Sequence, residues 1–142
     1  YDSTNIDSMI AQFTVKKFIV IVDTNYNYFI LRQKMFDLSE KLDIKIDTID
    51  RGYDKAKDII MSEGADEIYT KGYFPRRFNG ISLSLEYYEY FLKWMNFEQK
   101  NIALVAGIFT EKKEADSLLF QIKKIEPKSF MLKTDLYIGC MH

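Results

Sequence analysis

The sequence predicts an α+β fold built from two strand–helix–strand units. The clearer unit spans about residues 101–139 and opens with the apolar run Ile102–Phe109, which is typical of a buried strand. A helix is expected next, beginning at Thr110 and Glu111 and stopped by Pro127. Its apolar side chains recur at helical spacing: Ala115, Leu118, Leu119, Ile122 and Ile125. The segment Phe130–Ile138 is rich in strand formers and closes the unit.

The other unit spans about residues 16–50. Phe18–Val22 contains no polar residue, and Asp23–Asn27 supplies turn and cap residues. One apolar helical face follows, made of Ile30, Leu31, Met35, Leu38 and Leu42. Ile44, Ile46 and Ile49 are then interleaved with polar residues, which predicts a half-buried strand.

The two units form an internal repeat. A shift of 84 residues places Val20 on Leu104 and Leu38 on Ile122 without a gap, although almost no residues are identical. Two such units make a four-stranded antiparallel sheet with two helices on one face, which is the ferredoxin-like arrangement. The whole chain, 1–142, is expected to be one domain.

An insertion of about residues 51–100 separates the repeats. Tyr53–Ser62 is expected to be helical, Asp66–Gly80 to be irregular, and Leu85–Phe97 to be an aromatic helix capped by Ser82 or Ser84. The first fourteen residues are expected to form a frayed lead-in or a short helix around Ile6–Phe13. A structureless loop of this length would be unusual, so the insertion should pack against the rest of the domain.

The two best-defined strands lack the polar alternation of a sheet with one wet face. Both faces of Phe18–Val22 and of Ile102–Val105 are therefore expected to be dry. The repeat helices cover one face. The insertion, or a partner subunit, is expected to cover part of the other.

Composition argues against several classes of protein. The net charge is -1, so no overall field attracts nucleic acid, and no aromatic-rich RNA-binding strand motif is present. The single cysteine excludes an internal disulfide. No apolar run reaches the ~18 residues that span a bilayer. The chain begins at Tyr1 rather than Met, so it is expected to be a trimmed or mature chain whose leader or anchor is missing.

The candidate ligand surface is the segment around an arginine doublet. Two guanidinium groups flanked by aromatic rings can hold a carboxylate or phosphate while the rings stack on a sugar or base. The alternative is a structural loop whose arginines pair with local acids such as Asp66, Glu67 or Glu86. The predicted ligand-binding residues are Tyr73, Phe74, Arg76, Arg77, Phe78 and Tyr87.

No catalytic or metal site is expected. Glu86 and Glu89 are spaced as a carboxylate pair but without a third polar partner, so they are interpreted as solvated charges. Cys140 and His142 supply only two metal ligands of the about four that a closed site needs. No phosphate loop or nucleophile motif is present. We therefore expect a protein that is not an enzyme and has no cofactor.

The segment LVAGIFTEKKEADSLLFQIKKI resembles the SPOR (sporulation-related repeat) domain of bacterial envelope proteins. The shared features are a strand ending in Gly-x-Phe, here Gly107 to Phe109, then a polar cap and a helix opening at Glu114 and Ala115. Leu136–Gly139 is similar to the closing strand of that family. The resemblance covers about 75 residues in two pieces, and Val22-Asp23-Thr24 stands where the first unit should carry Gly-x-Phe.

This resemblance implies a non-enzymatic domain that binds peptidoglycan glycan strands stripped of their stem peptides, through the exposed sheet face. It also implies a location in the periplasm or cell envelope, with membrane anchoring through the missing N-terminus as an option. The alternative is a protein–protein interaction module, either an accessory lipoprotein domain or an immunity-type binder. A homodimer is left open.

Overall fold

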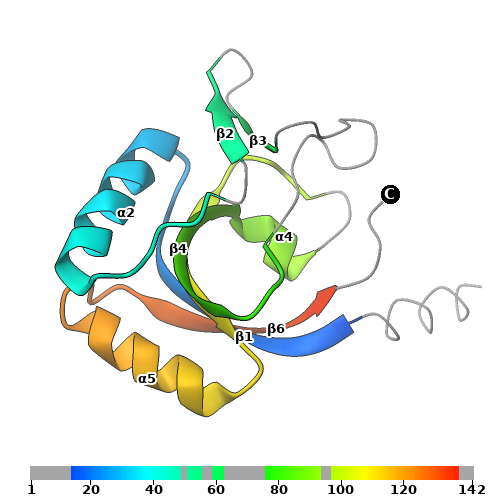
Figure 1. Ribbon diagram of the computed structural model, residues 1–142. Helices are drawn as coiled ribbons and strands as arrows, with labels where there is room; N and C mark the ends of the chain where they lie inside the picture. Colours follow the sequence, from blue (N-terminus) through cyan, green and yellow to red (C-terminus); the bar gives the residue numbers. More distant parts are fainter. Residues whose placement is uncertain (1–13, 49–50, 56–58, 63–75, 94–96, 138–142) are drawn as a thin grey trace, which may run out of the picture.

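The computed structural model describes residues 14–48, 51–55, 59–62, 76–93 and 97–137 of the chain (Figure 1). Within these ranges the fold is α+β, with one four-stranded antiparallel sheet, a two-stranded hairpin and three helices. The sheet has the strand order β4-β5-β1-β6. Its strands are β1 (Thr14–Asn25), β4 (Gly80–Tyr87), β5 (Ile102–Phe109) and β6 (Phe130–Tyr137). The helices are α2 (Tyr28–Leu42), α4 (Tyr88–Leu92) and α5 (Lys112–Lys123).

The central strand β1 pairs antiparallel with β5 on one side and with β6 on the other. Its segment Phe18–Val22 is buried throughout. The pairing with β5 shifts register on either side of Ile21, and such irregularities bend a strand and increase its twist. The β4 side of the sheet curves strongly in Figure 1.

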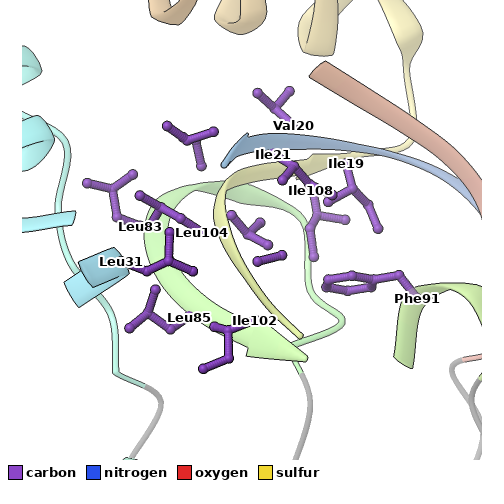
Figure 2. Packing of buried hydrophobic residues seen from close by; sticks show 14 of the residues in the cluster. Ile19, Val20, Ile21, Leu31, Leu83, Leu85, Phe91, Ile102, Leu104 and Ile108 are labelled. Carbon is purple, nitrogen blue, oxygen red and sulfur yellow. The ribbon is translucent and has the colours of Figure 1, made fainter. Parts of the chain in front are cut away.

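The sheet is covered on both faces. Ile108 and Gly107 are consecutive in β5, so their side-chain positions point to opposite faces. A side chain at Gly107 would meet Leu118 of α5, whereas Ile108 and its neighbour Ile19 lie toward Phe91 of α4 (Figure 2). Helices α2 and α5 therefore cover one face and α4 covers part of the other (Figure 1). Residues from the segment 51–100 thus contribute to the cover of the second face.

Five predicted elements are confirmed. The apolar runs lie within β1 and β5, the two periodic segments form α2 and α5, and the closing segment forms β6. Asn27 is the N-cap of α2, and its side-chain oxygen accepts hydrogen bonds from the backbone N–H groups of Phe29 and Ile30. Glu111 is the N-cap residue of α5, and the chain leaves helical structure before Pro127. The predicted helix around Ile6–Phe13 lies outside the described residues.

The predicted strand Ile44–Ile49 forms only one bridge in the described part of the chain. Ile46 pairs parallel with Leu83 of β4, through hydrogen bonds from Leu83 N–H to Lys45 O and from Asp47 N–H to Leu83 O. Next to this bridge, the pairing of β4 with β5 shifts register between Ile81 and Ser84. The edge position of the sheet therefore belongs to β4.

The prediction of a helix at Tyr53–Ser62 was wrong. This segment contributes to a hairpin of β2 (Arg51–Asp54) and β3 (Ile59–Ser62). The physical reason lies in tertiary contacts, because Ile60 is buried and its N–H donates to the Tyr87 hydroxyl at 2.7 Å. A backbone N–H held by a distant side chain does not depend on helical hydrogen bonding.

The prediction of one aromatic helix at Leu85–Phe97 was also wrong. β4 runs to Tyr87, and α4 is limited to Tyr88–Leu92, while residues 94–96 lie outside the description. The segment from Gly80 to Tyr87 alternates polar and apolar residues with the period of two that indicates a strand. Ser82 and Ser84 consequently lie within β4 rather than capping a helix.

Gly107 tests how tightly α5 packs on β5. A Cβ atom added there would lie 2.7 Å from the Phe109 ring and 2.9 Å from Leu118 Cδ2. We expect Gly107→Ala to lower the unfolding free energy by about 1–3 kcal/mol, because overpacking forces side chains and backbone to shift. Urea unfolding measures the change. Gly52→Ala is the matched control, since no atom lies within 4 Å of a Cβ built there, and equal losses in both variants would contradict this explanation.

Candidate functional site

The structure places Arg76 of the predicted ligand surface inside the protein. Its exposed fraction is 0%. One terminal nitrogen donates to Ser82 O at 2.8 Å and to Ser84 Oγ at 3.0 Å, and the other donates to Gly80 O at 3.1 Å. These hydrogen bonds hold Arg76, which precedes β4, against Gly80, Ser82 and Ser84 of that strand. Arg76 is therefore a structural residue, as in the alternative interpretation of the loop.

Glu86 is buried beside Arg76. Its carboxylate accepts a hydrogen bond from the Arg76 backbone N–H at 3.1 Å, and its exposed fraction is also 0%. The interpretation of Glu86 as a solvated charge was wrong, because the second sheet face is covered. Glu89 differs, since it is half-buried on α4 and lies 3.8 Å from the exposed Lys93 ammonium.

The other predicted ligand residues are not assembled into one open surface. Tyr87 is buried and its hydroxyl accepts the Ile60 N–H. Arg77 is half-buried, whereas Phe78 is exposed. The centroid of the Phe78 ring lies 5.4 Å from the guanidinium carbon of Arg76. Tyr73 and Phe74 lie outside the described residues. Only Arg77 and Phe78 of the described set reach solvent.

A different aromatic cluster lies where the start of α2 meets the hairpin. We call Tyr28, Phe29, Tyr53 and Lys55 the aromatic corner. The rings of Tyr28 and Tyr53 are stacked, with centroids 4.2 Å apart. The Phe29 ring packs T-shaped against both, with centroid distances of 5.4 Å to Tyr28 and 5.1 Å to Tyr53. Lys55 Nζ lies 5.7 Å from the Phe29 centroid. Phe29 remains 47% exposed, so the corner presents one open ring beside a cation.

A small cleft of about 30 Å³ opens beside the aromatic corner. Tyr28 forms one wall and the hairpin forms another. Its volume is about that of one water molecule, and polar groups stand among apolar ones in its lining. The lining residues are Tyr28, Met35, Ile46, Asp47, Thr48, Gly52, Ile60, Ser84 and Leu85.

Sequence reasoning missed the aromatic corner. The dense run Tyr26–Phe29 at the start of α2 was the available signal. Tyr53 could not be connected with it, because its segment was interpreted as a helix. Only the hairpin brings Tyr53 across the 25 residues that separate it from Tyr28.

A half-buried pair of salt bridges at Lys34 joins α2 to β1 and to the chain after α5. Lys34 Nζ of α2 lies 2.8 Å from Asp23 Oδ2 of β1 and 3.3 Å from Glu126 Oε2 after α5. The hydrogen bond to Asp23 is the main cause of a raised pKa for the Lys34 ammonium, burial opposes it, and the charges of both carboxylates add to it. These ion pairs hold α2 against β1 and against the chain after α5, so their role is structural.

Among the described residues, no group of three or more His, Cys, Asp and Glu side chains could hold a metal ion. None of the helices in those ranges is long and apolar enough to cross a membrane. Comparisons with known protein families, with curated proteins and with solved structures found no match.

Removing Arg76 should destabilise the fold strongly. We expect Arg76→Ala to lower the unfolding free energy by about 3 kcal/mol or more, since it removes the buried guanidinium that donates to Gly80 O, Ser82 O and Ser84 Oγ and leaves these groups without that donor. Arg77→Ala is the neighbouring control and should cost less, because Arg77 is only half-buried. Urea unfolding monitored by circular dichroism compares the two. A smaller loss for Arg76→Ala than for Arg77→Ala would refute the structural role.

The Lys34 network predicts a pH-dependent stability. Because the folded-state pKa of Lys34 is raised, its contribution is complete below the unfolded-state pKa, near 10.5, and is lost as pH rises through the folded-state value. We expect Lys34→Met to cost up to about 1 kcal/mol at pH 7. The difference from wild type should narrow above pH 10.5 in urea titrations between neutral and alkaline pH. A constant difference would contradict the assignment.

Proposed function

We propose that this chain is a non-enzymatic binding domain of the bacterial cell envelope and that its ligand is peptidoglycan glycan. The fold part of the proposal is a ferredoxin-like domain of SPOR type with an insertion between its halves. The order β4-β5-β1-β6 fits that arrangement if β4, from the insertion, occupies the edge position expected for the second strand.

The Gly-x-Phe resemblance gains a physical explanation in this fold. Phe109 turns its ring back over Gly107, and Leu118 of α5 lies on the same spot. Only a residue without Cβ leaves room for both. This supports the fold part of the proposal. It says nothing about a ligand, because the motif acts in packing.

The observation that carries the ligand part is the aromatic corner. A sugar ring presents an apolar C–H face that packs on an aromatic ring, and its hydroxyl groups need polar neighbours. Phe29 offers the open ring, while Asp47 and Thr48 line the adjacent cleft. Glycan strands without stem peptides carry free carboxylates on their muramic acid residues, and Lys55 supplies an opposite charge.

The proposed site differs from the sheet face that the family resemblance implies. Phe91 of α4 is buried against that face near Ile19 and Ile108 (Figure 2). A glycan would have to displace this helix to reach the sheet. The aromatic corner is open without any rearrangement.

A Phe29→Ala variant tests the ligand. We expect it to reduce co-sedimentation of the purified domain with amidase-treated peptidoglycan sacculi about fivefold or more, the effect of losing about 1 kcal/mol of stacking. Phe36→Ala is a matched control on the same helix. Phe36 is 42% exposed and also has a cation over its ring, Arg32 at 4.9 Å, and its replacement should leave binding unchanged.

An Arg77→Ala/Phe78→Ala variant separates the two candidate surfaces. Loss of binding in this variant, with Phe29→Ala unaffected, would move the site to the arginine loop that the sequence indicates. Absence of binding by the wild-type domain would reject the glycan. The working function would then be the protein-interaction module, which the exposed side chains Tyr26, Phe29 and Ile30 favour, because they follow one another closely at the start of α2.

A further inference from the structure

One edge of the four-stranded sheet is a long and regular strand. In the order β4-β5-β1-β6, β6 lies at the end of the sheet and pairs only with β1 among the described residues. Its eight residues contain no proline, and its pairing with β1 runs from Thr14 to Ile21 without a register shift. An edge strand of this kind directs the backbone N–H and C=O groups of every second residue away from the sheet. β6 can therefore hydrogen-bond to one further strand.

The opposite edge of the sheet is partly occupied. Leu83 of β4 donates its N–H to Lys45 O, and its carbonyl accepts the N–H of Asp47. This bridge lies in the middle of β4, so an added strand cannot run the full length of that edge. A full-length added strand is therefore accommodated at β6 rather than at β4.

The exposed charges of β6 complement each other in an antiparallel pair. Lys133 and Asp135 are both exposed and lie two residues apart, so they share one face of the strand. Thr134 between them faces α4, since its hydroxyl donates to Phe91 O, and the two charges face the α5 side. Within the described ranges, neither charge forms an ion pair. Charges at a free edge oppose pairing with an arbitrary strand, but this pair suits an identical strand that runs the other way.

We propose that β6 pairs antiparallel with β6 of a second copy of this chain about a two-fold axis at Thr134. The axis stands perpendicular to the sheet, so each side chain keeps to its own face. Lys133 of each copy then lies directly opposite the partner's Asp135, and the symmetry makes this pair twice. The two sheets join into one continuous sheet through backbone hydrogen bonds.

The period of the strand and its charges together select this register. Directly opposite residues must face the same side, so the axis can pass only through a residue position and not between two. With the axis at Lys133 or at Asp135, that residue would meet its own copy, which is a like-charge contact. The other face of the strand agrees. The axis at Thr134 places Leu132 opposite the partner's Leu136, whereas either neighbouring register places a leucine opposite a threonine.

The length of the strand sets the expected strength. Eight residues extend about 27 Å, so the contact lies at the small end of specific interfaces and depends on backbone hydrogen bonds. Lys16 of β1 pairs with Asp135 on its other side, so the charges would alternate in sign across three strands. We expect a reversible dimer whose population rises with protein concentration. This inference does not depend on the glycan proposal, because the aromatic corner lies on α2 and the hairpin.

Sedimentation velocity over a concentration series tests the pairing. We expect the wild-type chain to shift from monomer toward dimer. Lys133→Asp and Asp135→Lys should each weaken association about tenfold or more, because each places like charges opposite one another twice. An equimolar mixture of the two variants should associate as wild type does, since one copy then carries two acids where the other carries two lysines. The exchange Lys133→Asp/Asp135→Lys should restore association within a single chain type.

Lys45→Asp is the matched control. Lys45 is exposed and borders the opposite edge of the sheet, and its reversal changes the net charge by the same amount as Lys133→Asp. Association of this variant should equal that of wild type. Circular dichroism should show unchanged folding in all variants, because the substituted side chains are exposed.

Amide hydrogen exchange distinguishes this contact from any other dimer. At high protein concentration we expect added protection at alternate residues of β6, those whose N–H groups point away from β1. A wild-type chain that stays monomeric at the highest concentration would overturn the proposal. Single charge variants that associate normally, a mixture that stays monomeric, or a dimer without new protection in β6 would overturn it equally.

Discussion

The complete burial of β5 is the constraint on which the rest of the structure depends. Every residue from Ile102 to Phe109 is buried, so both faces of the sheet must exclude water. Helices α2 and α5 do so on one face. The other face is covered by α4 and by Arg76, which belong to the stretch between the predicted repeats. Described residues of that stretch, among them Arg76 and Phe91, are thus part of the core.

Covering the second face brings charge into the interior. Ser84 pairs with Val105 and Glu86 with Ala103, so the polar side chains of β4 share a face with buried apolar residues of β5. A buried carboxylate is tolerated only where opposite charge and hydrogen bonds accompany it. The Arg76 backbone N–H donates to the Glu86 carboxylate, and the Arg76 guanidinium binds two carbonyl groups of the same strand β4. The residue that looked most available for a ligand is therefore the one most needed inside.

How much could be predicted follows from how local each signal is. β1, α2, β5, α5 and β6 were predicted because their signals lie within the segment itself: an unbroken apolar run for β1 and β5, a helical apolar period for α2 and α5, and strand-forming residues for β6. The hairpin was not, because Ile60 is fixed by Tyr87, 27 residues away. The residues of β4 alternate polar and apolar, which indicates a strand, but the aromatic residues at its end were interpreted as part of a helix. The aromatic corner was not predicted either, because Tyr53 reaches Tyr28 only when its segment forms the hairpin.

Three exposed phenylalanines of the described residues share one arrangement, a cation over the ring. Phe29 lies under Lys55, Phe36 under Arg32 and Phe120 under Lys124. A cation over a ring lowers the apolar area open to water while keeping its charge available. A ligand that packs on such a ring gains most if it also brings a negative group to the cation. The proposed glycan ligand would meet this condition at Phe29, because its muramic acid residues carry carboxylates and Lys55 lies over that ring.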